Sequence, residues 1–210
     1  MEIVIPIFPR LTALDAVGPY EVLSRLPHAS VRFLAAEAGP QPTENGMLSL
    51  VAEGRLADHP HPDIVVMPGG FGTRALIDDE TFLDWLREAH AGSEWTTSVC
   101  TGSLVLAAAG ILDGVPATTH WLLRERLREL GAVPVEERVV RHGKIITAAG
   151  VSAGIDMALT LAADIAGDTY AEAIQLGIEY DPAPPFPGGS TRSARPEVIA
   201  LVRDRASELA

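Results

Sequence analysis

Short apolar runs alternate along this chain with longer segments whose apolar residues are spaced as on one face of a helix. The runs Ile3–Phe8, Val31–Ala36 and Asp63–Met67 are too short for helices, whereas Leu11–Leu26 and Asp79–His90 have the helical spacing. This alternation is typical of parallel strands covered by helices on both faces. The sequence therefore predicts an α/β fold in which helices sandwich a mostly parallel sheet.

The rest of the chain extends the same pattern. Further strands are predicted at Leu48–Val51, Thr96–Val99 and Val115–Thr118, a hairpin at Val139–Ala148, and helices at Thr101–Leu112, His120–Leu130, Ser152–Ala166, Thr169–Leu176 and Pro196–Leu209. Gly39–Gly46 has the composition of a turn region, and the proline-rich segment Tyr180–Gly189 that of an irregular loop or arm. Because there is no internal repeat or linker, we predict a single domain over residues 1–210.

Charge and composition exclude several classes of partner. The formal net charge of -12 repels phosphate backbones and anionic membrane surfaces, so we expect no nucleic-acid partner. No apolar run approaches the roughly 20 residues of a membrane-spanning helix, and the N-terminal segment MEIVIPIF lacks the features of a signal peptide. With one cysteine the chain has no intramolecular disulfide, and we expect a cytoplasmic protein.

The single cysteine, Cys100, stands between a β-rich run and a helix of small residues. The sequence TTSVC is followed directly by TGSLVLAAAG, which predicts a nucleophile elbow, a tight strand-to-helix turn at the carboxyl edge of the sheet. Amide groups at the helix N-terminus would favour the thiolate, so we expect the pKa of Cys100 to fall from about 8.5 towards neutrality. The alternative is a buried cysteine that packs as a small hydrophobic residue.

Two further features complete a candidate site at the same edge. Gly70 follows the strand Asp63–Met67, and its N–H together with the N–H of Thr101 would form a pair of donors for an anion. A plain tight turn is the other interpretation of Gly70.

Asp15, in the first turn of the first helix, is the candidate acid, since its apolar neighbours would raise its pKa. The other interpretation is an Asp15 that only complements the helix dipole; Glu21 is the alternative acid.

The histidines carry weaker signals. His120 directly follows a predicted strand and would orient Cys100 or a substrate, although a structural hydrogen bond explains it equally well. His59 and His61 in DHPHP lack partner ligands, which favours a solvated loop over a metal site. The stretch from Gly70 to Ala75 matches a dinucleotide fingerprint but lacks a ribose-binding acid. We therefore predict neither a metal nor a cofactor.

Five motifs occur in an order that resembles one known superfamily. They are LTALDAVGPYEVL, VVMPGGFGT, SVCTGSLVLAAAGILDG, ATTHW and GIEYDPAPPFPGGS. The chain resembles the DJ-1/PfpI superfamily, in the branch of isonitrile hydratases and of the amidase-like domains of AraC-type regulators. The resemblance implies a flavodoxin-like fold, as in class I glutamine amidotransferases, and a homodimer to which Tyr180–Gly189 would contribute an arm.

The resemblance also assigns roles to individual residues. It implies Cys100 as nucleophile, Asp15 as acid, Thr101 as the partner hydroxyl and Gly70 as a backbone donor, with His120 near the substrate. The implied reaction is hydration of an isonitrile, a small molecule, to an N-substituted formamide. A glyoxalase- or deglycase-like enzyme and a non-catalytic redox sensor are the alternatives. Regulators of this branch carry a C-terminal DNA-binding domain, and because the chain stops at Ala210 we do not expect a transcription factor.

Overall fold

The structure is a computed structural model that describes residues 1–208. The chain divides into two compact units, Met1–Ile178 and a second that begins at Glu179. The one domain predicted over residues 1–210 remains a prediction. No helix within residues 1–208 has both the length and the apolar character to cross a membrane.

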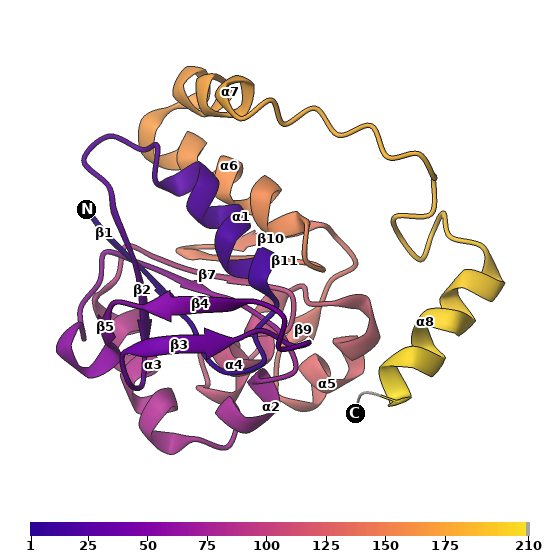
Figure 1. The fold of residues 1–210 in the computed structure, drawn as a ribbon, viewed down its shortest axis with the longest axis horizontal. Helices are drawn as coiled ribbons and strands as arrows, with labels where there is room; N and C mark the ends of the chain where they lie inside the picture. The colour runs from indigo at the N-terminus through magenta and orange to yellow at the C-terminus, as the bar shows by residue number, and fades with distance from the viewer. Residues whose placement is uncertain (209–210) are drawn as a thin grey trace. The chain divides into compact units, whose positions relative to one another are not determined.

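A seven-stranded sheet forms the centre of the first unit (Figure 1). Its strand order is β10-β11-β7-β6-β1-β2-β5, and all neighbours are parallel except β10 and β11. The strands of this sheet are β1 (Glu2–Pro6), β2 (Ser30–Ala35), β5 (Gly54–Arg55), β6 (Ile64–Met67), β7 (Trp95–Val99), β10 (Val139–His142) and β11 (Ile145–Ala148). This sheet confirms the predicted α/β class.

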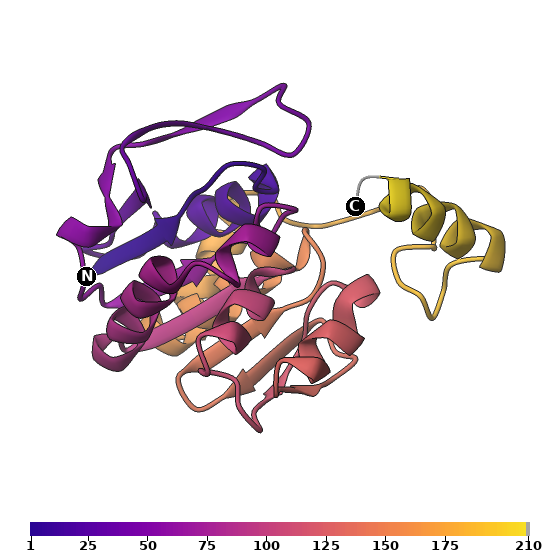
Figure 2. The ribbon, with the colours of Figure 1, turned by 90° about the horizontal axis from the view of Figure 1, so that it is seen from below.

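Helices cover the sheet (Figures 1 and 2). Helix α1 packs along α6, whereas α4 contacts α2, α3 and α5. The helices are α1 (Ala13–Leu23), α2 (Thr73–Leu76), α3 (Glu80–Gly92), α4 (Gly102–Ala108), α5 (Arg124–Glu129), α6 (Ala153–Ala166), α7 (Asp168–Gly177) and, in the second unit, α8 (Pro196–Glu208). The 3-10 turns are η1 (Leu56–Asp58) and η2 (Trp121–Leu123).

Two segments differ from the sequence-based expectations. The region Gly39–Gly46 contains a strand, β3 (Gly39–Pro42), which pairs with β4 (Ser49–Ala52) as an antiparallel hairpin outside the main sheet. Its two prolines are tolerated because a two-stranded ribbon has edges that need no donor. The predicted helix His120–Leu130 is split into η2 and α5. The expected end of the last helix at Leu209 lies outside the described residues.

The remaining short strands, β8 (Pro116–Ala117) and β9 (Val133–Pro134), pair with each other beside the sheet. The parallel order of β1, β6 and β7 has a direct consequence for the site. Their carboxyl ends, at Pro6, Met67 and Val99, meet at one edge because the strands are neighbours and run in the same direction. The segments that follow these strands therefore lie close together.

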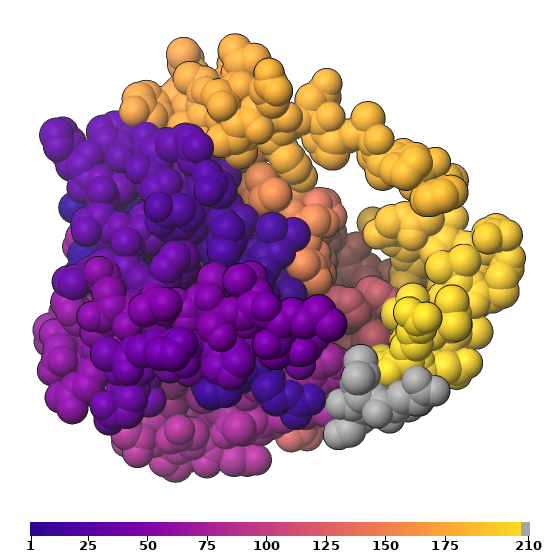
Figure 3. All heavy atoms as spheres, in the orientation of Figure 1, coloured from indigo at the N-terminus to yellow at the C-terminus, as the bar shows by residue number. Residues whose placement is uncertain are grey.

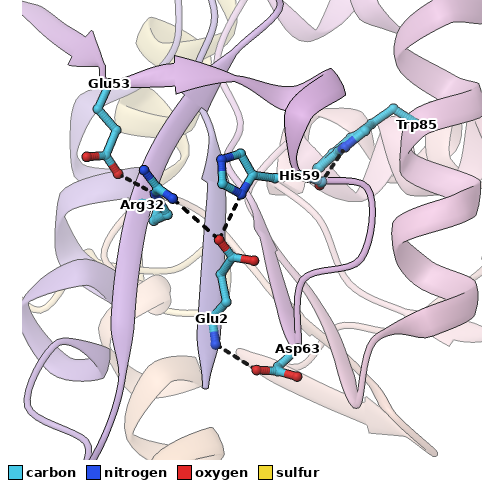
Figure 4. A network of polar contacts seen from close by, with 6 residues as sticks. All are labelled: Glu2, Arg32, Glu53, His59, Asp63 and Trp85. Atoms are coloured by element: carbon cyan, nitrogen blue, oxygen red, sulfur yellow. Dashed lines mark hydrogen bonds and ion pairs between the residues drawn. The ribbon is translucent and has the colours of Figure 1, made fainter.

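A polar network lies at the opposite, amino end of β1 (Figure 4). Glu2 pairs with His59 at 2.9 Å and with Arg32 at 3.8 Å, and Arg32 pairs with Glu53 at 2.8 Å. The carbonyl of His59 also accepts a hydrogen bond from Trp85 Nε1. His59 is thus held in place rather than solvated as predicted, and no group of three potential metal ligands occurs among residues 1–208.

The chain's only lysine, Lys144, joins the end of α3 to the sheet. Its Nζ donates to the carbonyl oxygens of His90 and Ser93, which are among the last groups of that helix and its C-cap. A cation at a helix C-terminus donates hydrogen bonds to carbonyls that the helix leaves unpaired. It also interacts favourably with the negative end of the helix dipole. Lys144 therefore contributes to the stability of the fold.

We expect Lys144→Met, which keeps most of the aliphatic stem, to lower the free energy of unfolding by about 1–2 kcal/mol, because two carbonyls lose a charged donor. Urea denaturation followed by circular dichroism measures the change. Lys144→Arg is the matched control and should retain most of the stability. Equal stability of wild type and Lys144→Met would contradict this role.

Candidate active site

Cys100 sits on a strained turn between β7 and α4. Its φ of 57° lies in the left-handed region, which is uncommon for a residue with a side chain. The backbone around it is fixed: the Cys100 N–H donates to Ala149 O at 2.8 Å, and the Cys100 carbonyl accepts from Ser103 Oγ at 3.1 Å and Thr119 Oγ1 at 3.0 Å. These contacts hold the strained conformation, which is the geometry of a nucleophile elbow.

The Cys100 sulfur is buried, and two backbone N–H groups point at it. The hydrogen bonds from Val151 and Thr101 lower the pKa of the thiol, but burial, followed by the charge of Asp15, outweighs them. The pKa of Cys100 is therefore raised above its ordinary value. The expectation of a pKa near neutrality is wrong, because a side chain only 5% exposed loses more by desolvation than two amides restore.

Asp15 is fully buried beside the thiol. Its Oδ2 accepts the Gly69 N–H at 3.0 Å, whereas its Oδ1 has no hydrogen bond of good geometry. Burial raises the pKa of Asp15 to about 7; the Gly69 hydrogen bond opposes this, the charge of Glu44 adds to it, and interaction with the Cys100 thiol lowers it slightly. The raised pKa confirms the direction predicted for this acid.

Gly69 stands where no side chain fits. A Cβ at this position would lie 2.6 Å from Thr101 N, 2.7 Å from Thr101 Oγ1 and 2.8 Å from Asp15 Oδ2. The glycine thus lets the backbone approach both the acid and the turn that carries Cys100. The close contact shows that the three segments meet at the carboxyl edge of the sheet.

Gly70 and Thr101 are arranged differently from the predicted pair of donors. The Gly70 N–H donates to Thr101 Oγ1 at 2.8 Å, and Thr73 Oγ1 lies 3.2 Å from the same oxygen. The Gly70 N–H is therefore not directed at an anion, because the Thr101 hydroxyl occupies it. The donor that the structure puts beside the Thr101 N–H at the sulfur is the N–H of Val151.

His120 and Glu21 lie outside this contact. His120 Nδ1 accepts from Leu122 N at 3.4 Å, and burial lowers the pKa of the ring, which keeps it neutral. Its ring lies against Gly150, and no hydrogen bond joins it to Cys100 among the described residues. Glu21 is half-exposed and pairs with Arg25 at 2.9 Å. Asp15 is therefore the acid that faces the thiol.

Sequence reasoning missed Val151 and Glu44. Val151 follows β11, which is the parallel neighbour of β7, so the register of the sheet brings it to the same edge. Its φ of 29° is unusual for a β-branched residue and aims its N–H at the sulfur. Glu44 lies between β3 and β4 in a segment without any motif, and no signal in the sequence identifies it.

The buried thiol and carboxyl behave as one titrating pair. The Asp15 charge raises the pKa of Cys100, so the two groups do not ionise together readily. Between the pKa of Asp15 and that of the thiol, the pair holds one proton, on sulfur. A pair of this kind moves a proton between nucleophile and acid without exchange with solvent.

Comparisons with known proteins show what the sequence is similar to. The sequence profile of the DJ-1/PfpI family matches residues 1–164. An isonitrile hydratase of Pseudomonas putida is 45% identical over 96% of this chain and 88% of its own length. The HTH-type transcriptional regulator CdhR of Pseudomonas aeruginosa is 32% identical, over 80% of this chain and 51% of its own length.

Solved structures give the same result for the fold. A ThiJ/PfpI family protein from Pseudomonas syringae superposes with a TM-score of 0.95 and 37% identity, over 99% of this chain and 86% of that one. DJ-1beta of Drosophila melanogaster superposes with a TM-score of 0.78 over 85% of this chain and 97% of that one. At 22% identity, the second likeness concerns the fold alone.

We expect the Asp15 carboxyl to titrate near pH 7, because burial penalises its charged form. The protonated C=O band, followed by infrared spectroscopy and assigned by subtraction of Asp15→Asn, measures the midpoint. Because the pKa is raised from 3.8, Asp15 contributes stability at low pH that is lost as pH rises from about 4 to about 7. The wild type should lose stability relative to Asp15→Asn over that window, and a midpoint near 4 would contradict the account.

Proposed function

The chain belongs to the DJ-1/PfpI family, and we propose that it is an isonitrile hydratase, which adds water to an isonitrile to give an N-substituted formamide. The observation that carries the proposal is the buried contact between the Cys100 thiol and Asp15, whose pKa is about 7. The isonitrile hydratase of Pseudomonas putida, 45% identical over 96% of this chain, supports the choice of substrate class.

The first step joins sulfur to the isonitrile carbon. The pair starts with one proton, on the thiol, and the Asp15 carboxylate accepts it. Asp15 then donates that proton to the isonitrile carbon as the thiolate attacks the same atom, which leaves a thioimidate on Cys100 and a carboxylate on Asp15. The N–H groups of Val151 and Thr101 stabilise the sulfur anion while it exists.

The second step consumes water. Asp15, again a carboxylate, takes a proton from a water molecule as the oxygen attacks the thioimidate carbon. Asp15 passes that proton to nitrogen, the bond from carbon to sulfur breaks, and the sulfur takes the proton of the new hydroxyl group as the formamide leaves. The sum is one isonitrile and one water giving one N-substituted formamide. Each step uses the same carboxyl, which its pKa near 7 permits.

Thr101 has a supporting part in this proposal. Its N–H is directed at the sulfur, and its hydroxyl accepts from Gly70 N at 2.8 Å. That hydrogen bond fixes the turn in which Gly69 donates to Asp15. We infer that Thr101 holds both members of the pair, whereas Gly70 shapes the turn and does not bind substrate through its N–H.

A redox sensor is less well supported by the site. Oxidation of a cysteine follows its thiolate content and its exposure, and Cys100 is buried with a raised pKa. A thiol that stays protonated until a substrate arrives suits an enzyme in which the acid removes its proton during the reaction. The site therefore favours catalysis over sensing.

We expect Cys100→Ala and Asp15→Asn each to lower the turnover of cyclohexyl isonitrile by at least about 10³-fold, because each removes one member of the pair. Formamide release, followed by liquid chromatography, measures the rate. In the wild type, kcat/KM should rise with pH through about 7, as Asp15 loses its proton. Near-full turnover by either variant would overturn the mechanism.

The same assay separates this function from a glyoxalase- or deglycase-like one. The wild type is measured side by side on methylglyoxal and cyclohexyl isonitrile, with Glu21→Gln as the control variant, since Glu21 lies outside the contact. Hydration of the isonitrile should be faster by orders of magnitude. A faster reaction of methylglyoxal would replace the proposed function with the alternative.

We further propose a homodimer. The hairpin of β3 and β4 leaves apolar side chains exposed, with an exposed fraction of 89% at Met47 and 64% at Val51. Its atoms are purple in Figure 3. Phe186, in the proline-rich arm predicted at Tyr180–Gly189, is 77% exposed. Apolar side chains that gather on one exposed element, as at Met47 and Val51 of this hairpin, are typical of surfaces that associate.

We expect sedimentation velocity to give a dimer for the wild type and a weakened dimer for Val51→Glu, because a buried charge opposes association. Phe186→Ser tests the arm in the same way. Glu53→Gln, a substitution of an exposed acidic residue next to the hairpin, is the control. A monomeric wild type at micromolar concentration would contradict the dimer.

The cellular setting is also a proposal. The free, single cysteine suits the reducing cytoplasm, and the net charge of -12 supports a small molecule rather than nucleic acid as the partner. The reaction as written needs no metal or cofactor.

A further inference from the structure

Glu44 makes three hydrogen bonds to segments at the carboxyl edge of the sheet. Its N–H donates to Leu11 O at 3.1 Å. Its Oε1 accepts from Thr12 Oγ1 at 2.7 Å and from Phe71 N at 3.3 Å. One side chain from the tip of the β3–β4 hairpin thus reaches two other loops.

Those two loops are the ones that hold Asp15. The Asp15 N–H donates to Thr12 O at 3.1 Å, and the Thr12 N–H donates to Gly69 O at 2.9 Å. Phe71 follows the Gly69–Gly70 turn, in which the Gly69 N–H donates to Asp15 Oδ2. Glu44 therefore closes a ring of hydrogen bonds around the acid.

The hydroxyl of Thr12 supports a dedicated role for this contact. Thr12 is at the N-cap position of α1, where a threonine side chain normally accepts from an N–H of its own helix. Here it makes no such bond and donates to Glu44 instead. The Thr12 hydroxyl therefore bonds to Glu44 and not to the helix.

Glu44 also acts on the pair through its charge. It raises the pKa of both Asp15 and Cys100. Of the remaining charged groups around α1, Asp156 on α6 pairs with Arg138. Arg10 and Arg74 lie over the Phe71 ring, with their guanidinium carbons 5.5 Å and 5.1 Å from its centre.

We propose that Glu44 is a positioning residue for the reaction, tying the turn before α1 to the loop after Gly70 so that Asp15 stays against Cys100. The inference rests on the proposed function for its kinetic consequences. It extends that function by a residue from a hairpin outside the main sheet. The charge of Glu44 additionally favours the protonated form of the acid.

Two substitutions separate the hydrogen bonds from the charge. Glu44→Gln keeps an oxygen that accepts from Thr12 and Phe71 but removes the charge. Glu44→Ala removes both. Glu53→Gln is the matched control, since Glu53 pairs with Arg32 in the network at the other end of the sheet (Figure 4).

We expect Glu44→Gln to keep kcat/KM at its optimum within about threefold and to move the acid limb of the pH profile to lower pH, since the pKa of Asp15 falls. Glu44→Ala should lower kcat roughly tenfold or more, with a smaller change in KM, as Asp15 loses its position. Glu53→Gln should match the wild type. An unmoved acid limb in Glu44→Gln, or an unchanged kcat in folded Glu44→Ala, would overturn the proposal.

Infrared titration of the Asp15 carboxyl tests the inference without any isonitrile. The midpoint should be lower in Glu44→Gln than in the wild type and unchanged in Glu53→Gln. Equal midpoints in all three proteins would overturn the role of Glu44 even if turnover is normal. Absence of turnover in the wild type, with the midpoint shifted as expected, would instead count against the proposed function alone. If Glu44→Ala does not fold, Thr12→Val, which removes the hydroxyl that donates to Glu44, tests the positioning role, and an unchanged kcat in that variant would overturn it.

Discussion

The structure of the site depends on one interaction, the contact between a buried carboxyl and a buried thiol. Desolvation raises the pKa of both groups, and the charge of Asp15 raises that of Cys100 further. In water Asp15 would be ionised well below pH 7, and its carboxylate would be a weak base towards a thiol. Burial raises the pKa of Asp15 to about 7, which suits a group that must both accept and donate a proton in the proposed addition of a thiol to an isonitrile.

The surrounding structure serves to hold that contact. The backbone of Cys100 stays in the left-handed region because two hydroxyls bind its carbonyl and Ala149 accepts from its N–H. Gly69 permits an approach that any side chain would block. Because parallel neighbours end at one edge, β1, β6 and β7 deliver all of these groups to the same place.

Much of this arrangement is predictable from the sequence. The alternation of apolar runs and helical segments gives the parallel sheet, and the change from TTSVC to TGSLVL locates the turn at Cys100. The direction of the Asp15 pKa follows from its apolar neighbours. The pKa of Cys100 cannot be predicted in this way. Burial by segments that are distant in the sequence raises it, and hydrogen bonds from Thr101 and Val151 lower it, so the outcome depends on the tertiary structure. The hydrogen bond of Gly70 depends on the tertiary structure too, because its N–H donates to a side chain rather than to an anion. Glu44 was missed because the hairpin that brings it to the site has the sequence of a turn region.

The most direct test of the account is the covalent bond between Cys100 and the isonitrile carbon. The wild type is mixed with excess cyclohexyl isonitrile, quenched rapidly during turnover and examined by intact-mass spectrometry and peptide mapping. We expect a mass increase equal to one whole isonitrile molecule, located on the peptide that contains Cys100, and absent both from Cys100→Ala and from Asp15→Asn, which lacks the group that moves the proton in the first step. Turnover of isonitrile by the wild type without any such adduct under rapid quenching would contradict the account.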